Sequence, residues 1–355
     1  MSSVLFVDLD AIVGNWRTIR SRLASGCRAA AVLKADGYGL GAAPIAQALH
    51  QAGCTRFFIA TLEEGVALRS AVPGAEIIVL NGVEPGTARL FGPHRLIPML
   101  NSRPQIEEWG SAGPCALHVD TGMSRLGITL EEAQSLPPPP GLMLISSHLA
   151  CADEPDQPMN RYQLAEFAAI RAHFQGIEAS LAASSGTFLG LEWHADWVRP
   201  GAALYGVNPM RGQPNPMAPV VTLQAKILQI REIDQGRTVG YGATHRAGNK
   251  ARLATAAIGY ADGIMRCLSN RGHGFVGDRR VPLVGRISMD LTVFDVTAVP
   301  QEDLFPGASI ELLGHSITVD DMAEAAGTIG YEILTSLGPR LERRYLHQNR
   351  LGHAQ

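Results

Sequence analysis

The 355-residue sequence predicts an α/β fold, with an N-terminal (β/α)8 TIM barrel followed by a mainly β C-terminal domain. Eight short apolar runs alternate with helical segments between residue 29 and about residue 205. A linker-like stretch, RGQPNPMAP, follows from residue 211, and β-type runs punctuated by Gly, Asp and Pro dominate the remainder. We therefore expect a barrel over residues 1–212 and a second domain over residues 213–355.

The eight apolar runs have the composition of buried parallel strands. Amphipathic segments such as LEEGVALRSA separate them, as expected when helices cover both faces of a parallel sheet. An open doubly wound sheet would give a similar pattern, but eight repeats favour a closed barrel. The expected strands are AAAVLK (29–34), FFIA (57–60), EIIVL (76–80), RLIPM (95–99), CALHVD (115–120), LMLISS (142–147), SLAAS (180–184) and WVRPGAALY (197–205).

The second domain is expected to be mainly strands with one helical insert. Its β-type runs are VTLQAKILQIREI, RLATAAIGYA, RVPLVGRIS, DLTVFDV and SIELLG. The segments DDMAEAAG and GYEILTSL carry the helical pattern. The run PPPP at residues 137–140 predicts a stiff surface loop in the barrel domain.

Bulk composition excludes several classes of function. Hydrophobic residues make up 46% and charged residues 18%, which is typical of a globular protein with a large core. A net charge of −3 does not favour binding to nucleic acid or to an anionic membrane. Five scattered cysteines without a C-x-x-C motif indicate reduced thiols and a cytoplasmic location. The first residues do not read as a signal peptide, and no transmembrane helix is expected.

The first candidate site residue is Lys34, which ends an apolar strand and precedes the Gly-rich turn ADGYGLG. Active sites of barrels gather at the C-terminal ends of the strands. A lysine desolvated there loses part of its charge, becomes nucleophilic and can form a Schiff base. A single strand-end lysine more often extends its ammonium group into solvent, so Lys34 by itself does not establish a site.

Further polar residues follow the later strands of the expected barrel. The segment HVDTGMSRLG carries Asp120, Gly122 and Arg125, and SHLACADE carries His148. ASSGT supplies two hydroxyl groups after the seventh strand, and VRPGAALYG supplies Arg199 and Gly201 at the eighth. Loops after the last two strands of such barrels commonly bind phosphate through backbone N–H groups and small hydroxyl side chains. Polar groups from at least five strands therefore converge on one rim.

At these residues the sequence resembles the alanine racemase family, and the resemblance covers nearly the full chain. The matching segments, in order, are AVLKADGYG, VDTGMSRLG, SHLACADE, RPGAALYG, VGYGATHRA, IGYADG, VGRISMD and GYEIL. The family implies an isomerase that interconverts L-alanine and D-alanine by two-base proton exchange on a pyridoxal-phosphate aldimine. It also implies a cytoplasmic homodimer with shared active sites that supplies D-alanine for peptidoglycan.

The resemblance also assigns roles to individual residues. Lys34 would hold pyridoxal 5'-phosphate and act as the base for D-alanine, and Tyr241, from the other subunit, would be the base for L-alanine. Arg125, Tyr260 and Met289 would bind or gate the substrate. The cofactor would contact Lys34, Tyr38, His148, Ser185, Arg199, Gly201, Ala202 and Tyr331.

Arg199 would face the pyridine nitrogen. A guanidinium group only donates hydrogen bonds, so the ring nitrogen would stay unprotonated and the ring would withdraw electrons less strongly. That property favours proton exchange at Cα over side reactions such as transamination.

The match departs from the family at three positions. His118 stands where many relatives carry a carbamylated lysine that supports the arginine, so Arg125 must be held by a bound anion or by His118 itself. Ser184 replaces an expected asparagine, and Ser288 an expected cysteine. The group around His148 and Cys151 lacks ligand pairs at zinc spacing, and no metal is assigned.

Three other interpretations stay open. The one most similar to an alanine racemase is a broad-specificity, serine or lysine racemase. A decarboxylase of similar architecture would pair the ring nitrogen with a carboxylate, against which Arg199 argues. A pyridoxal-phosphate-binding homeostasis protein would lack the second domain.

Overall fold

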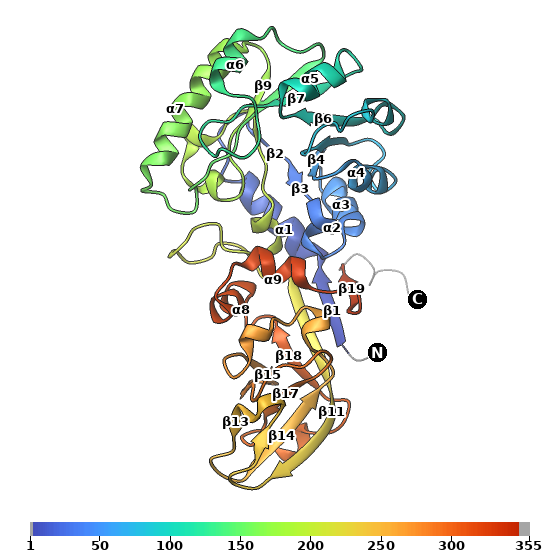
Figure 1. Cartoon of the computed structure of the whole chain (residues 1–355), viewed down its shortest axis with the longest axis vertical. Helices are drawn as coiled ribbons and strands as arrows, with labels where there is room; N and C mark the ends of the chain where they lie inside the picture. The colour runs from blue at the N-terminus through green and yellow to red at the C-terminus, as the bar shows by residue number, and fades with distance from the viewer. Residues whose placement is uncertain (1–2, 348–355) are drawn as a thin grey trace. The chain divides into compact units, whose positions relative to one another are not determined.

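The computed structural model describes residues 3–347, which fall into two compact units (Figure 1). The barrel unit is Ile12–Ala218, and the β unit is Met1–Ala11 together with Pro219–Gln355. The expected division at residue 212 therefore differs from the structure in one main respect: the first eleven residues belong to the β unit. The boundary in the linker itself lies six residues later than expected, after Ala218.

The barrel unit is a ring of parallel strands. Seven strands pair in the order β3-β4-β5-β6-β7-β8-β9, and every pairing is parallel. The bounds are β2 (Arg28–Ala29), β3 (Ala31–Val32), β4 (Arg56–Ile59), β5 (Glu76–Val79), β6 (Leu96–Leu100), β7 (Cys115–His118), β8 (Leu142–Ser146), β9 (Glu178–Ser180) and β10 (Trp197–Val198).

The ring closes through β10. This strand pairs in parallel with β2, which continues into β3 after a single residue, and its far side meets the β9 segment through a bridge between Ala183 and Arg199. The N–H groups of Ala30 and Val32 donate to Val198 O and Pro200 O across the closing seam. Eight strand segments therefore form a closed barrel, and the predicted (β/α)8 fold is confirmed.

Helices follow most of the barrel strands. The bounds are α1 (Leu9–Arg20), α2 (Lys34–Tyr38), α3 (Ala42–Gln51), α4 (Leu62–Arg69), α5 (Arg103–Trp109), α6 (Leu130–Ser135) and α7 (Pro158–His173). Helices α4 and α6 begin with capping boxes, Thr61 with Glu64 and Thr129 with Glu132, which satisfy N–H groups of the first turn. Pro137–Pro140 form an irregular connection, as expected of the PPPP loop.

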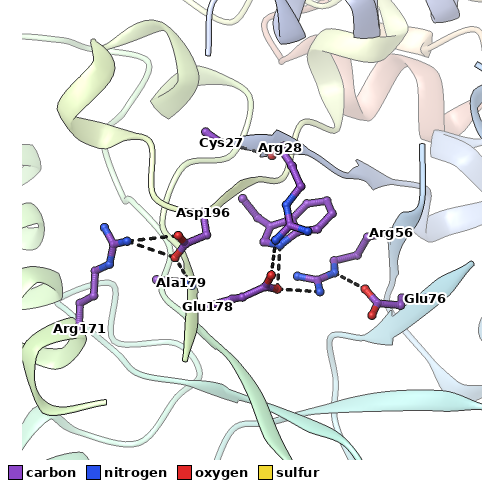
Figure 2. Close-up of polar contacts among 9 residues, drawn as sticks. Cys27, Arg28, Arg56, Glu76, Arg171, Glu178, Ala179 and Asp196 are labelled. Carbon is purple, nitrogen blue, oxygen red and sulfur yellow. Dashed lines mark hydrogen bonds and ion pairs between the residues drawn. The ribbon is translucent and has the colours of Figure 1, made fainter. Parts of the chain in front are cut away.

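An ion-pair network joins five strands at their N-terminal ends, opposite the predicted site (Figure 2). Glu178 of β9 contacts both Arg28 of β2 and Arg56 of β4, and Arg56 also contacts Glu76 of β5. Trp197 of β10 donates its Nε1–H to Glu178 at 2.9 Å, and both guanidinium groups lie 4.0 Å from its ring. The side chain of Arg56 is 3% exposed, so its charge depends on these partners.

The β unit is built on a mixed sheet. Its strands pair in the order β16-β15-β18-β11-β1-β19, and β14 pairs with both β11 and β17. The bounds are β1 (Ser3–Asp8), β11 (Val221–Ile233), β12 (Thr238–Val239), β13 (His245–Arg246), β14 (Ala251–Ala256), β15 (His273–Val276), β16 (Arg279–Pro282), β17 (Thr292–Asp295), β18 (Ser309–Leu313) and β19 (Glu342–Leu346). The expected helical insert is present as α8 (Val319–Ala326) and α9 (Gly330–Ser336).

Strand β1 explains the changed division of the chain. It runs antiparallel to β11 and parallel to β19, and Leu5 and Val7 are fully buried there. Its apolar residues fit either a barrel or an antiparallel sheet, and only the long-range pairing with β11 decides between them. No helix within residues 3–347 is both long and apolar enough to cross a membrane.

The network around Glu178 gives a stability prediction. Glu178→Ala leaves the buried Arg56 with one carboxylate partner instead of two, and we expect a loss of about 2 kcal/mol in the free energy of unfolding. Glu192→Ala, which removes a pair with Arg161 in which both side chains are largely exposed, should leave the free energy of unfolding almost unchanged. Urea unfolding of both variants measures the difference, and equal losses would contradict the structural importance of the network.

Candidate active site

Lys34 begins a left-handed turn at the C-terminal end of β3. Ala35, Asp36, Gly37 and Tyr38 all have positive φ, between 52° and 64°. This conformation costs roughly 1–2 kcal/mol for each residue that is not glycine, so contacts elsewhere must hold it. The Asp36 carboxylate accepts the N–H of Ala42 at 2.8 Å, and the Glu64 carboxylate accepts the N–H of Ala35 at 2.8 Å.

The surroundings of Lys34 make its ammonium group easier to deprotonate. Its pKa is lowered, first because neighbouring protein displaces water from the ammonium group, and then because the Arg125 guanidinium repels it. Glu64 acts in the opposite direction. The side chain nevertheless remains accessible from solvent, so a reagent can reach Nζ. A lysine with this combination of properties is suited to nucleophilic chemistry.

Tyr38 and Gly201 meet at the seam that closes the barrel. A Cβ at Gly201 would lie 2.3 Å from the Tyr38 hydroxyl oxygen, so a side chain at this position would displace that hydroxyl. The Tyr38 ring lies 4.6 Å from the buried Tyr205 ring, and the Tyr205 hydroxyl donates to Val32 O at 3.0 Å. These contacts fix a tyrosine hydroxyl against the loop that follows β10.

The loops after β9 and β10 contribute small polar groups. Ser184 Oγ accepts the N–H groups of Gly201 and Ala203 at 3.0 and 3.1 Å, so this hydroxyl ties the two loops together. The N–H of Gly201, one expected phosphate ligand, is therefore already bonded within the protein. By contrast, the Ser185 hydroxyl and the Ala202 N–H have no hydrogen-bond partner within residues 3–347 and are available to a ligand.

Arg199 is buried and rigidly held. Its Nη1 donates to Ser180 O and Ser180 Oγ at 2.8 and 2.5 Å, and its Nη2 donates to Ser147 O at 2.6 Å. Burial lowers the pKa of Arg199 to about 10, which still leaves the guanidinium cationic at neutral pH. Its position at the end of β10 is where the sequence predicted it.

A fully buried glutamine of α7 supports the loop that carries His148. Gln163 Nε2 donates to His148 O at 2.9 Å and to Thr121 Oγ1 at 3.2 Å, and its Oε1 accepts the Ala150 N–H at 2.8 Å. Thr121 Oγ1 in turn lies 2.7 Å from Ser147 Oγ. The network therefore couples the loops after β7 and β8 with the backbone that binds Arg199.

His118 and His148 both stand among cations. Burial is the main cause that lowers the pKa of His118 to about 4 and of His148 to about 3, and Arg199 and Arg125 lower both further. The amide of Asn101 donates to Leu80 O and Met99 O, so its oxygen must accept a hydrogen bond from His118 Nδ1, at 2.9 Å. His118 is therefore a neutral imidazole with its proton on Nδ1.

Arg125 is presented on an ordered turn. The Asp120 carboxylate accepts the N–H groups of Gly122, Met123 and Ser124 at 2.8–2.9 Å and so shapes the loop after β7. The Arg125 side chain is exposed and makes no hydrogen bond or ion pair within residues 3–347. Its guanidinium group is thus free to bind an anion, and His118 does not hold it by a hydrogen bond.

The other four predicted residues belong to the β unit. Tyr241, 72% exposed, lies at the tip between β12 and β13, next to Gly240 and Gly242 with φ near 70°. Tyr260 and Met289 lie on adjacent loops, because the N–H groups of Tyr260 and Ala261 donate to Ser288 O and Met289 O at 3.1 and 3.0 Å.

Local packing explains the residues found at Gly259 and Ser288, which precede Tyr260 and Met289 in sequence. A Cβ at Gly259 would lie 2.3 Å from Met289 O, so glycine is required where the two loops meet. Ser288 Oγ accepts the Leu291 N–H and donates to Leu291 O, so the serine shapes its own turn. Tyr331 is half-exposed at the start of α9.

Sequence reasoning missed several residues that position these side chains. They are Glu64, Asn101, Ser147, Gln163 and Ser180. The sequence around each of them is ordinary, since a glutamate in a helix-capping box or a serine near a strand end has no special meaning by itself. Within residues 3–347 no three His, Cys, Asp or Glu side chains are placed to bind a metal ion.

The two histidines give a pH prediction. The unfolded chain binds protons at histidine near pH 6.5, whereas His118 and His148 titrate near 4 and 3 in the folded chain. The free energy of unfolding is therefore highest above about pH 6.5 and falls toward pH 4, by at most about 1.4 kcal/mol per pH unit for each histidine. Urea unfolding from pH 4 to 7 should show a shallower fall for His118→Gln than for the wild-type protein, and equal slopes would contradict the prediction.

Comparison with known proteins covers both units. The family model "Alanine racemase, N-terminal domain" matches residues 7–209, and "Alanine racemase, C-terminal domain" matches residues 220–345. The chain is 47% identical to an alanine racemase of Rhizobium meliloti over 97% of both chains, and 49% identical to that of Rhodospirillum rubrum over 97% and 96%.

A solved structure agrees with these matches. The alanine racemase of Bartonella henselae, determined with covalently bound pyridoxal phosphate, superposes with a TM-score of 0.92 at 38% identity and covers 98% of this chain and 100% of its own. Sequence, family model and architecture agree over nearly the whole length, and the chain belongs to the alanine racemase family.

Proposed function

We propose that this protein is a pyridoxal 5'-phosphate-dependent alanine racemase that interconverts L-alanine and D-alanine. The observation that carries the proposal is the placement of Lys34, whose pKa is lowered, on the same barrel rim as the cationic Arg199 and the available Ser185 hydroxyl and Ala202 N–H. The family membership of both units supports it.

The residues of the barrel rim fit this cofactor. Lys34 Nζ would hold it covalently, and Tyr38, Ser185, Gly201 and Ala202 would surround its phosphate. The close approach of Tyr38 to Gly201, which a Cβ would block, leaves the tyrosine hydroxyl at this loop. When bound, the cofactor would withdraw electrons from the substrate and make its Cα–H acidic.

Arg199 would determine which reaction the site favours. Its guanidinium can donate a hydrogen bond but cannot accept one, and Ser180 and Ser147 hold it rigidly in the barrel. Facing the pyridine nitrogen, Arg199 would leave that nitrogen without a proton. His148, kept neutral by burial and by the surrounding cations, would lie beside the ring as an uncharged neighbour.

Racemisation requires a base on each face of the substrate Cα. Lys34 Nζ would take the proton from D-alanine, and the Tyr241 hydroxyl would take it from L-alanine. Tyr241 lies on an exposed, glycine-flanked tip of the β unit, a position suited to reaching a site outside its own fold. We infer that the protein is a homodimer in which Tyr241 completes the active site of the partner subunit, and Tyr331 would approach the cofactor phosphate.

The substrate would bind by charge and by size. Arg125, which has no protein partner within residues 3–347, would bind the carboxylate, and Tyr260 and Met289 on their adjoining loops would limit the side chain. We further propose that the enzyme acts in the cytoplasm and supplies D-alanine for peptidoglycan. Five free cysteines are consistent with a reducing compartment.

Trapping of the cofactor tests whether Lys34 is the residue that binds it covalently. The purified protein should be yellow, and borohydride reduction should fix the cofactor irreversibly to Lys34, because this lysine has a lowered pKa and lies on the barrel rim. Peptide mass spectrometry locates the label, and Lys226→Arg serves as the control lysine variant. Label on any other lysine would contradict the assignment.

Tyr241→Phe tests the second base. We expect it to lower deuterium exchange at Cα of L-alanine by about 10²-fold or more, while the cofactor absorbance stays unchanged. The same exchange assay with L-serine and L-lysine distinguishes an alanine racemase from a broader racemase. An active Tyr241→Phe variant would contradict the two-base proposal.

Mixed subunits test whether the sites are shared. Lys34→Ala and Tyr241→Phe homodimers should both be inactive, but a mixed dimer keeps one complete site. After subunit exchange the activity should recover to about a quarter of the wild-type value if each site uses both chains. No recovery would show that each subunit builds its own site.

A further inference from the structure

Glu64 links the ends of two neighbouring barrel strands. Its Oε1 accepts the N–H of Ala35, the residue after Lys34, at 2.8 Å. Its Oε2 accepts the N–H of Ala60, just after β4, at 2.7 Å, and that of Thr61 at 3.4 Å. The carboxylate thus fixes the peptide that follows Lys34 to the end of the adjacent strand.

Capping of helix α4 does not require the bond from the Ala35 N–H to Glu64. In α6 the equivalent Glu132 accepts the N–H of its own N-cap, Thr129, and otherwise pairs with the exposed Arg103. Both glutamates close a capping box, but only Glu64 also holds the backbone of the turn that contains the predicted reactive lysine. The second oxygen of Glu64 therefore serves the site and not the helix.

The turn requires such a contact. Four consecutive residues after Lys34 are left-handed, and Ala35 and Asp36 lack the freedom of glycine. The Glu64 bond holds the first of these residues, and the Asp36 bond to Ala42 holds the turn against α3. Without Glu64 the peptide adjoining Lys34 would have no side-chain acceptor at this position.

The negative charge of Glu64 also affects the pKa of Lys34. Among the charged groups that act on Lys34, Arg125 disfavours the ammonium form and Glu64 favours it. Glu64 is only partly exposed, so solvent screens its charge less than that of a surface carboxylate. Removing the charge should make the lysine easier to deprotonate.

We propose that Glu64 is a positioning residue for Lys34, which clamps the Ala35 N–H through Oε1 and thereby holds the left-handed turn from which the lysine projects. The proposal deepens the proposed function and rests on it for the chemistry of Lys34. The clamp itself is a property of the protein without cofactor, so it can be tested separately.

Glu64→Gln is the test, in the full-length protein without cofactor, with Glu132→Gln as the matched control. Glutamine has one acceptor oxygen, so it cannot serve both strand ends. We expect amide hydrogen exchange in the peptide covering residues 34–40 to rise by about tenfold in Glu64→Gln and to stay at the wild-type rate in Glu132→Gln.

A second measurement tests how the charge of Glu64 affects the protonation of Lys34. The pH at which Lys34 is half-acylated by acetic anhydride, read by peptide mass spectrometry, should be lower in Glu64→Gln than in wild type and unchanged in Glu132→Gln. Attachment of pyridoxal phosphate, trapped with borohydride, should slow by about fivefold in Glu64→Gln alone, because the lost orientation of Lys34 Nζ outweighs its easier deprotonation.

The outcomes separate the two proposals. If the two variants behave alike in exchange and in acylation, Glu64 is only a helix cap and the inference is wrong. If the wild-type protein attaches no cofactor at Lys34, the proposed function fails, whereas exchange and acylation still report on the clamp.

Discussion

Closure of the barrel between β10 and the β2–β3 segment is the constraint on which the rest of the barrel unit depends. The parallel pairing of Trp197 and Val198 with Arg28 and Ala29 brings the end of the eighth strand beside the end of the first. Lys34 and Gly201 lie far apart in sequence, and they come to one rim because their strands share this seam. The same closure places Tyr38 against Gly201, with no space for a Cβ between them. At the opposite end of the strands, Glu178 and Trp197 join the seam to the buried Arg56.

The rim is electrostatically unusual, because it gathers cations and holds both histidines neutral. Arg199 and Arg125 disfavour additional positive charge, which lowers the pKa of His118 and of His148 beyond the effect of burial. Arg125 likewise contributes to the lowered pKa of Lys34. A rim of this kind attracts a phosphate and a carboxylate, and it keeps the lysine able to react. His118 is an uncharged group fixed by Asn101, and it makes no hydrogen bond to Arg125.

Much of the fold could be predicted from sequence. Eight apolar runs at barrel spacing indicated the strands within a few residues, and the helical insert at α8 and α9 was evident from its pattern. The first strand could not be assigned, because a short apolar segment such as Ser3–Asp8 pairs equally well with any exposed strand edge of suitable register. The residues that hold the site, among them Glu64, Asn101 and Gln163, were equally invisible. Glu64 bonds to a residue 29 positions away, Asn101 to one 17 away and Gln163 to one 42 away, and no local pattern encodes such contacts.

The sequence by itself determined the chemistry available to the protein: a lysine at a strand end, an arginine at the eighth strand, and small hydroxyl residues beside it. These follow from residue identity and from the rule that parallel strands of one barrel end on the same rim. Only the tertiary structure decided how those groups behave. Burial and neighbouring charge set the pKa of Lys34, His118 and His148, and the bonds of Glu64 and Asp36 hold the left-handed turn. Such properties depend on which atoms surround a group in space, and that arrangement exists only once the barrel has closed.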